Sequence, residues 1–151
     1  MAVTFNLKNF TLNDFMAFSE LDEGSDAFME AILKQVDKWD YPFEKTLEAV
    51  DEAELNVYKQ IVDGFINTVK EMKPNEDAQS RIKIDVSKWK VKQYRKVTQY
   101  IQTSRFDQLI PLLQEVVVEP NVPVADMPYP LFVTLIDKVR KDVSDSMNQG
   151  K

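Results

Sequence analysis

The fold class is decided by residues 55–72, LNVYKQIVDGFINTVKEM. Apolar residues recur in this stretch at every third or fourth position: Leu55, Tyr58, Ile61, Val62, Phe65, Val69 and Met72. Such spacing places them on one face of an α-helix of about five turns. Asp51 and Glu54 resemble a pair that caps the start of this helix. The stretch therefore predicts a long amphipathic helix that turns one face to a core.

Helical spacing recurs along most of the chain. Further helices are expected to start at Thr11 (paired with Asp14), at Ser25, near Val91, at Ser104 (paired with Asp107) and at Asp126, whose first turn would hold Pro128 and Pro130. The second helix would carry Phe28, Ile32, Val36 and Trp39 on one face. Residues expected to be buried are Phe15, Phe28, Ile32, Tyr58, Phe65, Tyr94, Phe106, Ile110, Leu135 and Val139.

The two halves of the chain repeat each other in apolar pattern. At a shift of 79 residues, Leu12 matches Val91 and Phe15 matches Tyr94. Further along, Phe28 matches Phe106 at a shift of 78, and Tyr58 matches Phe132 at a shift of 74. The predicted fold is mainly α, with two tandem similar three-helix units, 1–75 and 76–151, packed together as one globule. The extended segments Val3–Leu7 and Ile82–Val86 could pair as a short two-stranded β ribbon.

The composition argues against catalysis. The 151 residues include no Cys and no His, which removes disulfides, thiolate nucleophiles, imidazole bases and Cys/His zinc sites. Only three glycines are present, too far apart for a phosphate-binding loop. We expect no catalytic residue, no metal ligand and no cofactor, although an enzyme built on carboxylates and lysines stays open. No signal peptide or membrane span is expected, so the predicted location is the cytoplasm, or the host cytoplasm for a phage protein.

Charge is distributed unevenly between the halves. Residues 1–75 carry a net charge of −8 and residues 76–151 carry +2, within a total of −6. Segment 81–105 holds eight Lys and Arg residues against Asp85 alone. Its candidate partner-binding residues are Lys88, Lys90, Lys92, Arg95 and Lys96. They would dock an acidic protein surface. The alternatives are a nucleic-acid-associated subunit that stacks bases on Trp89 and Tyr94, and a helix face that is merely solvated.

The C-terminal half also resembles a family. The runs Val86–Tyr94, Leu112–Val118 and Val124–Tyr129 together look like small tail-assembly proteins of tailed bacteriophages, best over residues 84–145. The resemblance implies an assembly chaperone or accessory factor that holds a tail component, without cofactor or catalysis. It lies in core positions, so it assigns no functional residue.

Overall fold

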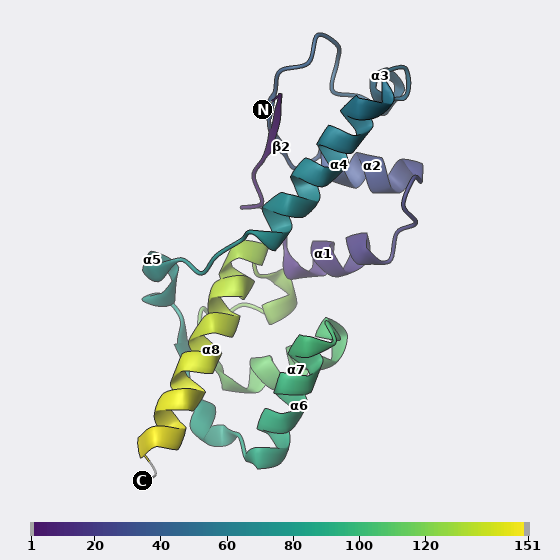
Figure 1. Ribbon diagram of the computed structural model, residues 1–151. Helices are drawn as coiled ribbons and strands as arrows, with labels where there is room; N and C mark the ends of the chain where they lie inside the picture. Colours follow the sequence, from purple (N-terminus) through teal and green to yellow (C-terminus); the bar gives the residue numbers. More distant parts are fainter. Residues whose placement is uncertain (1, 150–151) are drawn as a thin grey trace.

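In the computed structural model, which describes residues 2–149, each half of the chain forms its own group of helices, and the two groups lie end to end (Figure 1). The first half contains β1 (Val3–Phe5), α1 (Leu12–Ser19), α2 (Asp26–Leu33), β2 (Val36–Trp39), α3 (Leu47–Asp51) and α4 (Leu55–Lys70). The second contains α5 (Glu76–Gln79), β3 (Lys83–Ile84), the 3-10 turn η1 (Val86–Lys88), α6 (Val91–Gln102), α7 (Phe106–Val116), β4 (Val117–Glu119), the 3-10 turn η2 (Val124–Asp126) and α8 (Tyr129–Gln149).

The order of elements is similar in both halves. Each contains a strand, two helices, a second strand, a short helical segment and a long helix, and the second half adds α5 before its first strand and η1 after it. The mainly α fold is therefore confirmed. The division at 75/76 stays a prediction, and residues 150–151 of the second predicted unit lie outside the described residues.

The predicted strand pairing is wrong. Val3–Leu7 and Ile82–Val86 do not form a ribbon with each other, because each half contains a strand partner of its own. β1 pairs antiparallel with β2, with Phe5 opposite Val36. β3 pairs in the same way with β4, with Ile84 opposite Val117. Both pairs join segments of one half, so the ribbon is present twice.

The second predicted helix is shorter than expected. α2 ends at Leu33, and Val36 and Trp39 lie in β2 instead of on a helix face. The strand pairs also correct the alignment of the halves, since β1 and β3 are 79 positions apart whereas β2 and β4 are 81 apart. At that shift the buried Phe28 corresponds to the buried Leu109. The pairing of Phe28 with Phe106 is therefore wrong by three residues, close to one helical turn.

Three of the predicted helix starts are confirmed: α6 begins at Val91, and Thr11 and Ser25 cap α1 and α2. The Thr11 hydroxyl accepts a hydrogen bond from the Asp14 N–H, and the Asp14 carboxylate accepts one from the Thr11 N–H, both at 3.1 Å. The Ser25 hydroxyl accepts from the Phe28 N–H at 3.2 Å. These bonds satisfy amide groups that have no acceptor within their own helix.

The capping residues predicted for three other helices are wrong. Asp51 lies in α3, and α4 follows Glu54, whose side chain makes no capping bond. Ser104 has a φ of 55° and is followed by Arg105 as the N-cap of α7. Asp126 lies in η2, three residues before α8 begins. Acidic and hydroxyl residues are also common in the turns and short helices that precede a helix, so their spacing alone does not identify a cap.

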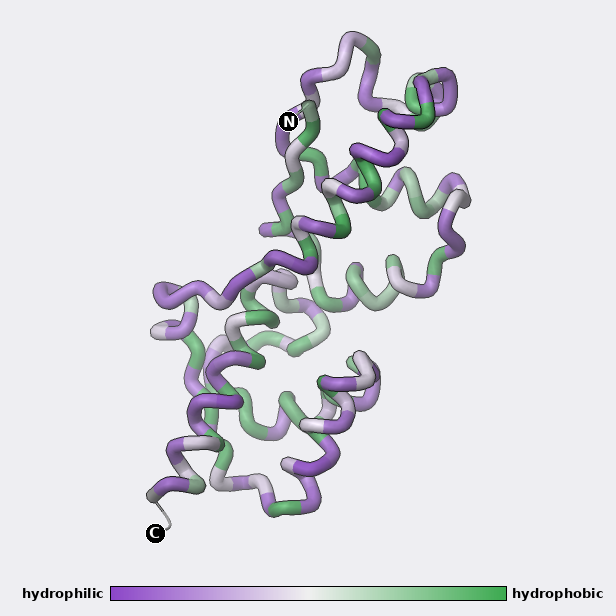
Figure 2. The backbone as a smooth tube through the Cα atoms, viewed as in Figure 1, coloured by the Kyte–Doolittle hydropathy of each residue, from purple (hydrophilic) through white to green (hydrophobic). Residues whose placement is uncertain are grey.

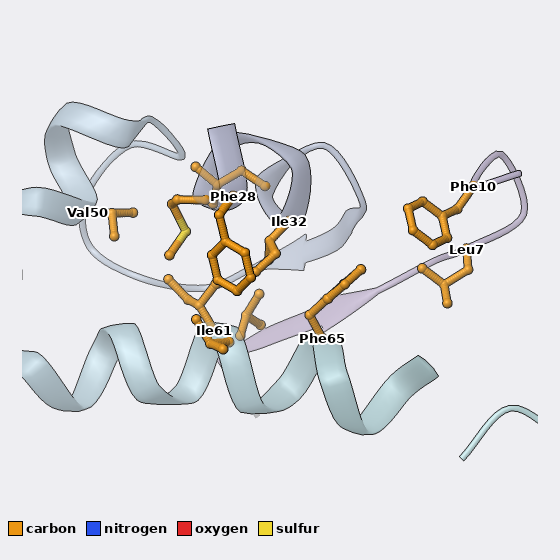
Figure 3. Close-up of a cluster of buried hydrophobic side chains, with 11 residues drawn as sticks. Leu7, Phe10, Phe28, Ile32, Val50, Ile61 and Phe65 are labelled. Carbon is orange, nitrogen blue, oxygen red and sulfur yellow. The ribbon is translucent and has the colours of Figure 1, made fainter. Parts of the chain in front are cut away.

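Each half has its own hydrophobic cluster, and Figure 2 shows hydrophobic positions recurring along the elements of both halves. In the first, Phe28 and Ile32 of α2 face Ile61 and Phe65 of α4 (Figure 3). Of the residues expected to be buried, five are: Phe28, Ile32, Phe65, Leu135 and Val139. The other five are half-buried at the edges of the clusters: Phe15, Tyr58, Tyr94, Phe106 and Ile110.

The halves meet where the start of α1 lies against the start of α8. The Leu12 N–H donates to the Met127 carbonyl at 2.8 Å, and the Tyr129 N–H donates to the Phe10 carbonyl at 2.6 Å. Thr11 and Pro128 lie opposite each other between these two bonds. The Leu12 side chain is fully buried in the cluster of the second half. The junction is therefore apolar contact framed by two backbone hydrogen bonds.

Candidate protein-interaction surface

Three of the five predicted binding residues lie along one face of α6. Lys92, Arg95 and Lys96 are spaced by three and one positions, which brings their side chains to one side of the helix. All three are exposed, and they line a shallow groove with Tyr94, Thr98, Gln99 and Gln102. Figure 2 shows this helix as mostly hydrophilic. The groove is broad and open, as suits contact with a flat protein surface.

Lys88 and Lys90 precede this face. Lys88 ends η1 and is exposed, and its Nζ lies 3.4 Å from the Glu115 carbonyl, which accepts a hydrogen bond from it. Lys90 is the N-cap residue of α6, and its N–H donates to the Gln93 side chain at 2.9 Å. The five residues, here called the basic cluster, thus form a helix face and the approach to that helix.

No member of the basic cluster forms an ion pair within the described residues. The ion pairs among residues 2–149 are Lys59–Asp63, Lys83–Glu119 and Lys141–Asp137, and none includes a member of the cluster. Asp85 is the one acid in segment 81–105. Hydrogen bonds from the Ser87 hydroxyl and N–H lower the pKa of Asp85, with a smaller contribution from Lys88. Asp85 therefore stays charged, yet it is bonded to its own turn.

The cluster also lies at the less favourable end of a helix. The N-terminus of a helix carries partial positive charge, so Asp and Glu stabilise it and Lys and Arg do not. The first turn of α6 has no acidic residue, whereas the first turn of α1 has Asp14. Lys90 and Lys92 add positive charge to this end. An anionic group from outside the chain would relieve both charges together.

The aromatic residues of the segment face inward. Trp89 and Tyr94 are half-buried and pack against the cluster of the second half. The Trp89 indole N–H donates to the Leu112 carbonyl at 3.3 Å. Each ring is therefore partly covered by the fold, which limits stacking on bases.

Two apolar residues at helix starts are exposed although they fit the apolar pattern. Leu55 and Val91 fit the helical stripes, but their exposed fractions are 89% and 74%. Each is the first residue of its helix, where the chain enters from solvent. Charged neighbours were the available signal, since Glu54 precedes Leu55, and Lys90 and Lys92 flank Val91.

The described residues contain no group of three or more Asp and Glu side chains placed to hold a metal ion. Between residues 2 and 149, every helix is too short or too polar to cross a membrane. Comparison with protein-family models, curated proteins and solved structures finds no match for the chain.

Proposed function

We propose that this chain is a non-enzymatic protein-interaction factor in an assembly process, and that it docks an acidic protein surface through the basic cluster. One observation supports this most directly: five exposed cations occur within nine residues of the chain, Lys88 to Lys96, and none of them forms an ion pair among residues 2–149. Positive charge on a groove steers an acidic partner and selects against basic ones. The resemblance of residues 84–145 suggests a phage tail component as the partner, met in the host cytoplasm.

The orientation of the aromatic side chains favours a protein over a nucleic acid. A single-stranded ligand needs exposed rings for stacking, whereas Trp89 and Tyr94 are half-buried against the cluster of the second half. Duplex binding would need a wider field of positive charge than one helix face on a chain of net charge −6. The nucleic-acid-associated alternative therefore rests on charge alone.

The test is affinity capture from the native cell with the full chain and with the triple variant Lys92→Glu, Arg95→Glu, Lys96→Glu. The triple variant should lose a protein partner that the unchanged chain retains, with the same helix content and melting temperature, because exposed charges contribute little to folding. The matched control reverses Lys34, Lys38 and Lys45, three exposed lysines of the first half. It should keep the partner.

Salt provides a second measurement. The capture should weaken between 0.1 M and 1 M salt, where the screening length falls from ~10 Å to ~3 Å. Capture that survives both the triple variant and high salt would contradict the proposal. Recovery of nucleic acid in place of protein would support the alternative.

A further inference from the structure

The junction between the halves has an uncovered counterpart at each end of the molecule. The first half contributes Phe10, Thr11, Leu12 and Phe15 to the junction, which correspond to Trp89, Lys90, Val91 and Tyr94 at a shift of 79. The second half contributes Met127, Pro128 and Tyr129, which correspond to Ala53, Glu54 and Leu55 at a shift of 74. The start of α4 and the start of α6 lie at opposite ends of the molecule (Figure 1).

Exposure marks these ends as unpartnered. Leu55 and Val91 are the two most exposed large apolar side chains among the described residues, at 89% and 74%. Their counterparts at the junction are Tyr129, which is half-buried, and Leu12, which is fully buried. Each end thus leaves in solvent the apolar residue that the junction covers.

The backbone at the ends is arranged as at the junction. The Ala53 N–H donates to the Val50 carbonyl at 3.0 Å, as the Met127 N–H does to Val124 at 3.1 Å. Leu55 and Val91 are first helical residues, whose N–H groups have no acceptor within their own helix. At the junction the corresponding groups of Tyr129 and Leu12 donate across to the other half. Two such bonds, Val91 to Ala53 and Leu55 to Trp89, could therefore form between two copies.

A hollow lies where the junction holds a ring. Phe15 packs against Phe106 and Tyr129, with ring centroids 5.7 and 4.8 Å away. The counterparts of these two residues are Ser25, at the shift of 81 that the strands define, and Leu55. Both line a hollow of 180 Å³ beside Tyr58. Ser25 is smaller than its counterpart Phe106 and leaves this space open. Tyr94 corresponds to Phe15, the ring that packs at this place in the junction, so Tyr94 of another copy would fill the hollow.

Charge distinguishes the ends from the junction. Thr11 and Pro128, opposite each other at the junction, correspond to Lys90 and Glu54. Asp51 and Glu52 add acid beside Leu55, and Lys88 and Lys92 add base beside Val91. The halves are tethered and need no steering, whereas two separate molecules gain from opposite charges at the surfaces that meet.

We propose that copies of this chain associate head to tail, the Leu55 end of one molecule seating on the Val91 end of the next. The contact repeats the internal junction, with Lys90 opposite Glu54 and Tyr94 in the hollow beside Leu55. The two surfaces differ, so the contact is heterologous and each dimer keeps one free end of each kind, which extends into rings or filaments. Without a tether the contact is weaker than the junction and depends on concentration. The inference shares Lys90 with the basic cluster, and it goes beyond the proposed function because it also depends on Leu55, Val91 and the acidic residues Asp51, Glu52 and Glu54.

Complementation between two variants tests this directly. Leu55→Asp removes one end and Val91→Asp removes the other, so sedimentation velocity should show a monomer for each variant alone. Their 1:1 mixture should form a dimer, because each variant supplies the intact end that the other lacks. The dimer should grow no further, because both of its free ends carry an Asp substitution. The unchanged chain should sediment faster as its concentration rises. Val118→Asp, at an apolar position 52% exposed on β4, is the matched control and should associate like the unchanged chain.

A charge exchange provides a second test. Glu54→Lys and Lys90→Glu should each weaken association, because each places like charges opposite each other. Mixing the two variants should restore it, since every contact then pairs opposite charges. This test replaces no apolar residue, so it stands even where an Asp variant fails to fold.

Three results would overturn the inference: an unchanged chain that stays monomeric at every concentration, single variants that still associate, or mixtures that do not complement. The Lys92, Arg95 and Lys96 variant separates the two proposals. Loss of the captured partner in that variant, together with a monomeric unchanged chain, would leave the proposed function intact and reject self-association. If the single variants complement each other and the triple variant still captures the partner, self-association stands and docking through the basic cluster is rejected.

Discussion

The rings of Phe15 and Tyr129 lie 4.8 Å apart between centroids, which joins the first helix of one half to the last helix of the other. Tyr129 also contacts Phe10 and Phe132, at 6.3 Å each. The Tyr129 ring therefore belongs to an aromatic group that contacts both clusters. Burial raises the pKa of Tyr129, because the phenolate loses hydration there.

This raised pKa predicts a loss of stability at high pH. The folded pKa lies above the unfolded value of about 10, so the stabilisation is complete below pH ~10 and is lost as pH rises through the folded pKa. Urea unfolding between pH 8 and 12 should show a steeper alkaline loss for the unchanged chain than for Tyr129→Phe. Parallel losses would contradict the assignment. Tyr41→Phe is the control, since Tyr41 is less buried and should account for less of the loss.

Truncation to alanine should be costly at Leu12 and nearly neutral at Val91. Leu12 is fully buried across the junction, so Leu12→Ala should lower the free energy of unfolding by about 2–5 kcal/mol. Val91→Ala should change it by less than about 0.5 kcal/mol, because its side chain is in solvent. Urea titration of dilute protein measures both. Equal effects would show that the two positions have similar surroundings.

Phe65 should be a costly residue of the first cluster. Its ring makes edge contacts with Phe5, Phe10 and Phe18 at 5.6, 5.8 and 5.1 Å. Phe65→Ala should cost roughly 3–5 kcal/mol, and Phe65→Leu should cost less because it leaves a smaller cavity. Thermal and urea unfolding give the values. An unchanged melting temperature for Phe65→Ala would contradict the packing in Figure 3.

The start of α1 depends on reciprocal hydrogen bonds. Thr11→Ala removes the hydroxyl that accepts from the Asp14 N–H and should cost about 1 kcal/mol. Thr11→Ser keeps the hydroxyl and should recover most of that loss. Chemical denaturation compares the three chains. A serine variant as unstable as the alanine variant would assign the effect to the lost methyl group.

Local signals predicted the elements that depend on neighbours in sequence. Thr11 with Asp14 and Ser25 with Phe28 are bonds over three residues, so the sequence contains both partners. β2 was missed because spacings of four and three at Val36 and Trp39 fit a helix, while the partner strand β1 lies more than thirty residues earlier. Short apolar runs cannot distinguish these cases without that partner.

The basic cluster was predictable in part. The spacing of Lys92, Arg95 and Lys96 places them on one face once α6 is assumed, and the structure agrees. The exposure of Leu55 and Val91 was not predictable from the sequence, because an apolar residue at a helix start fits the apolar stripe whether or not another element covers it. What decides is the position of the other half, which pattern alone does not supply.

Strand pairing within each half has a consequence for synthesis of the chain. On the ribosome, β1 can pair with β2 once Trp39 has emerged, and the buried residues of the cluster around Phe65 can pack together before the second half has emerged. Leu12 cannot be covered then, since Met127 and the rest of its surroundings follow more than a hundred residues later. The nascent first half therefore leaves the Leu12 side chain uncovered at the start of α1 until the residues around Met127 are available.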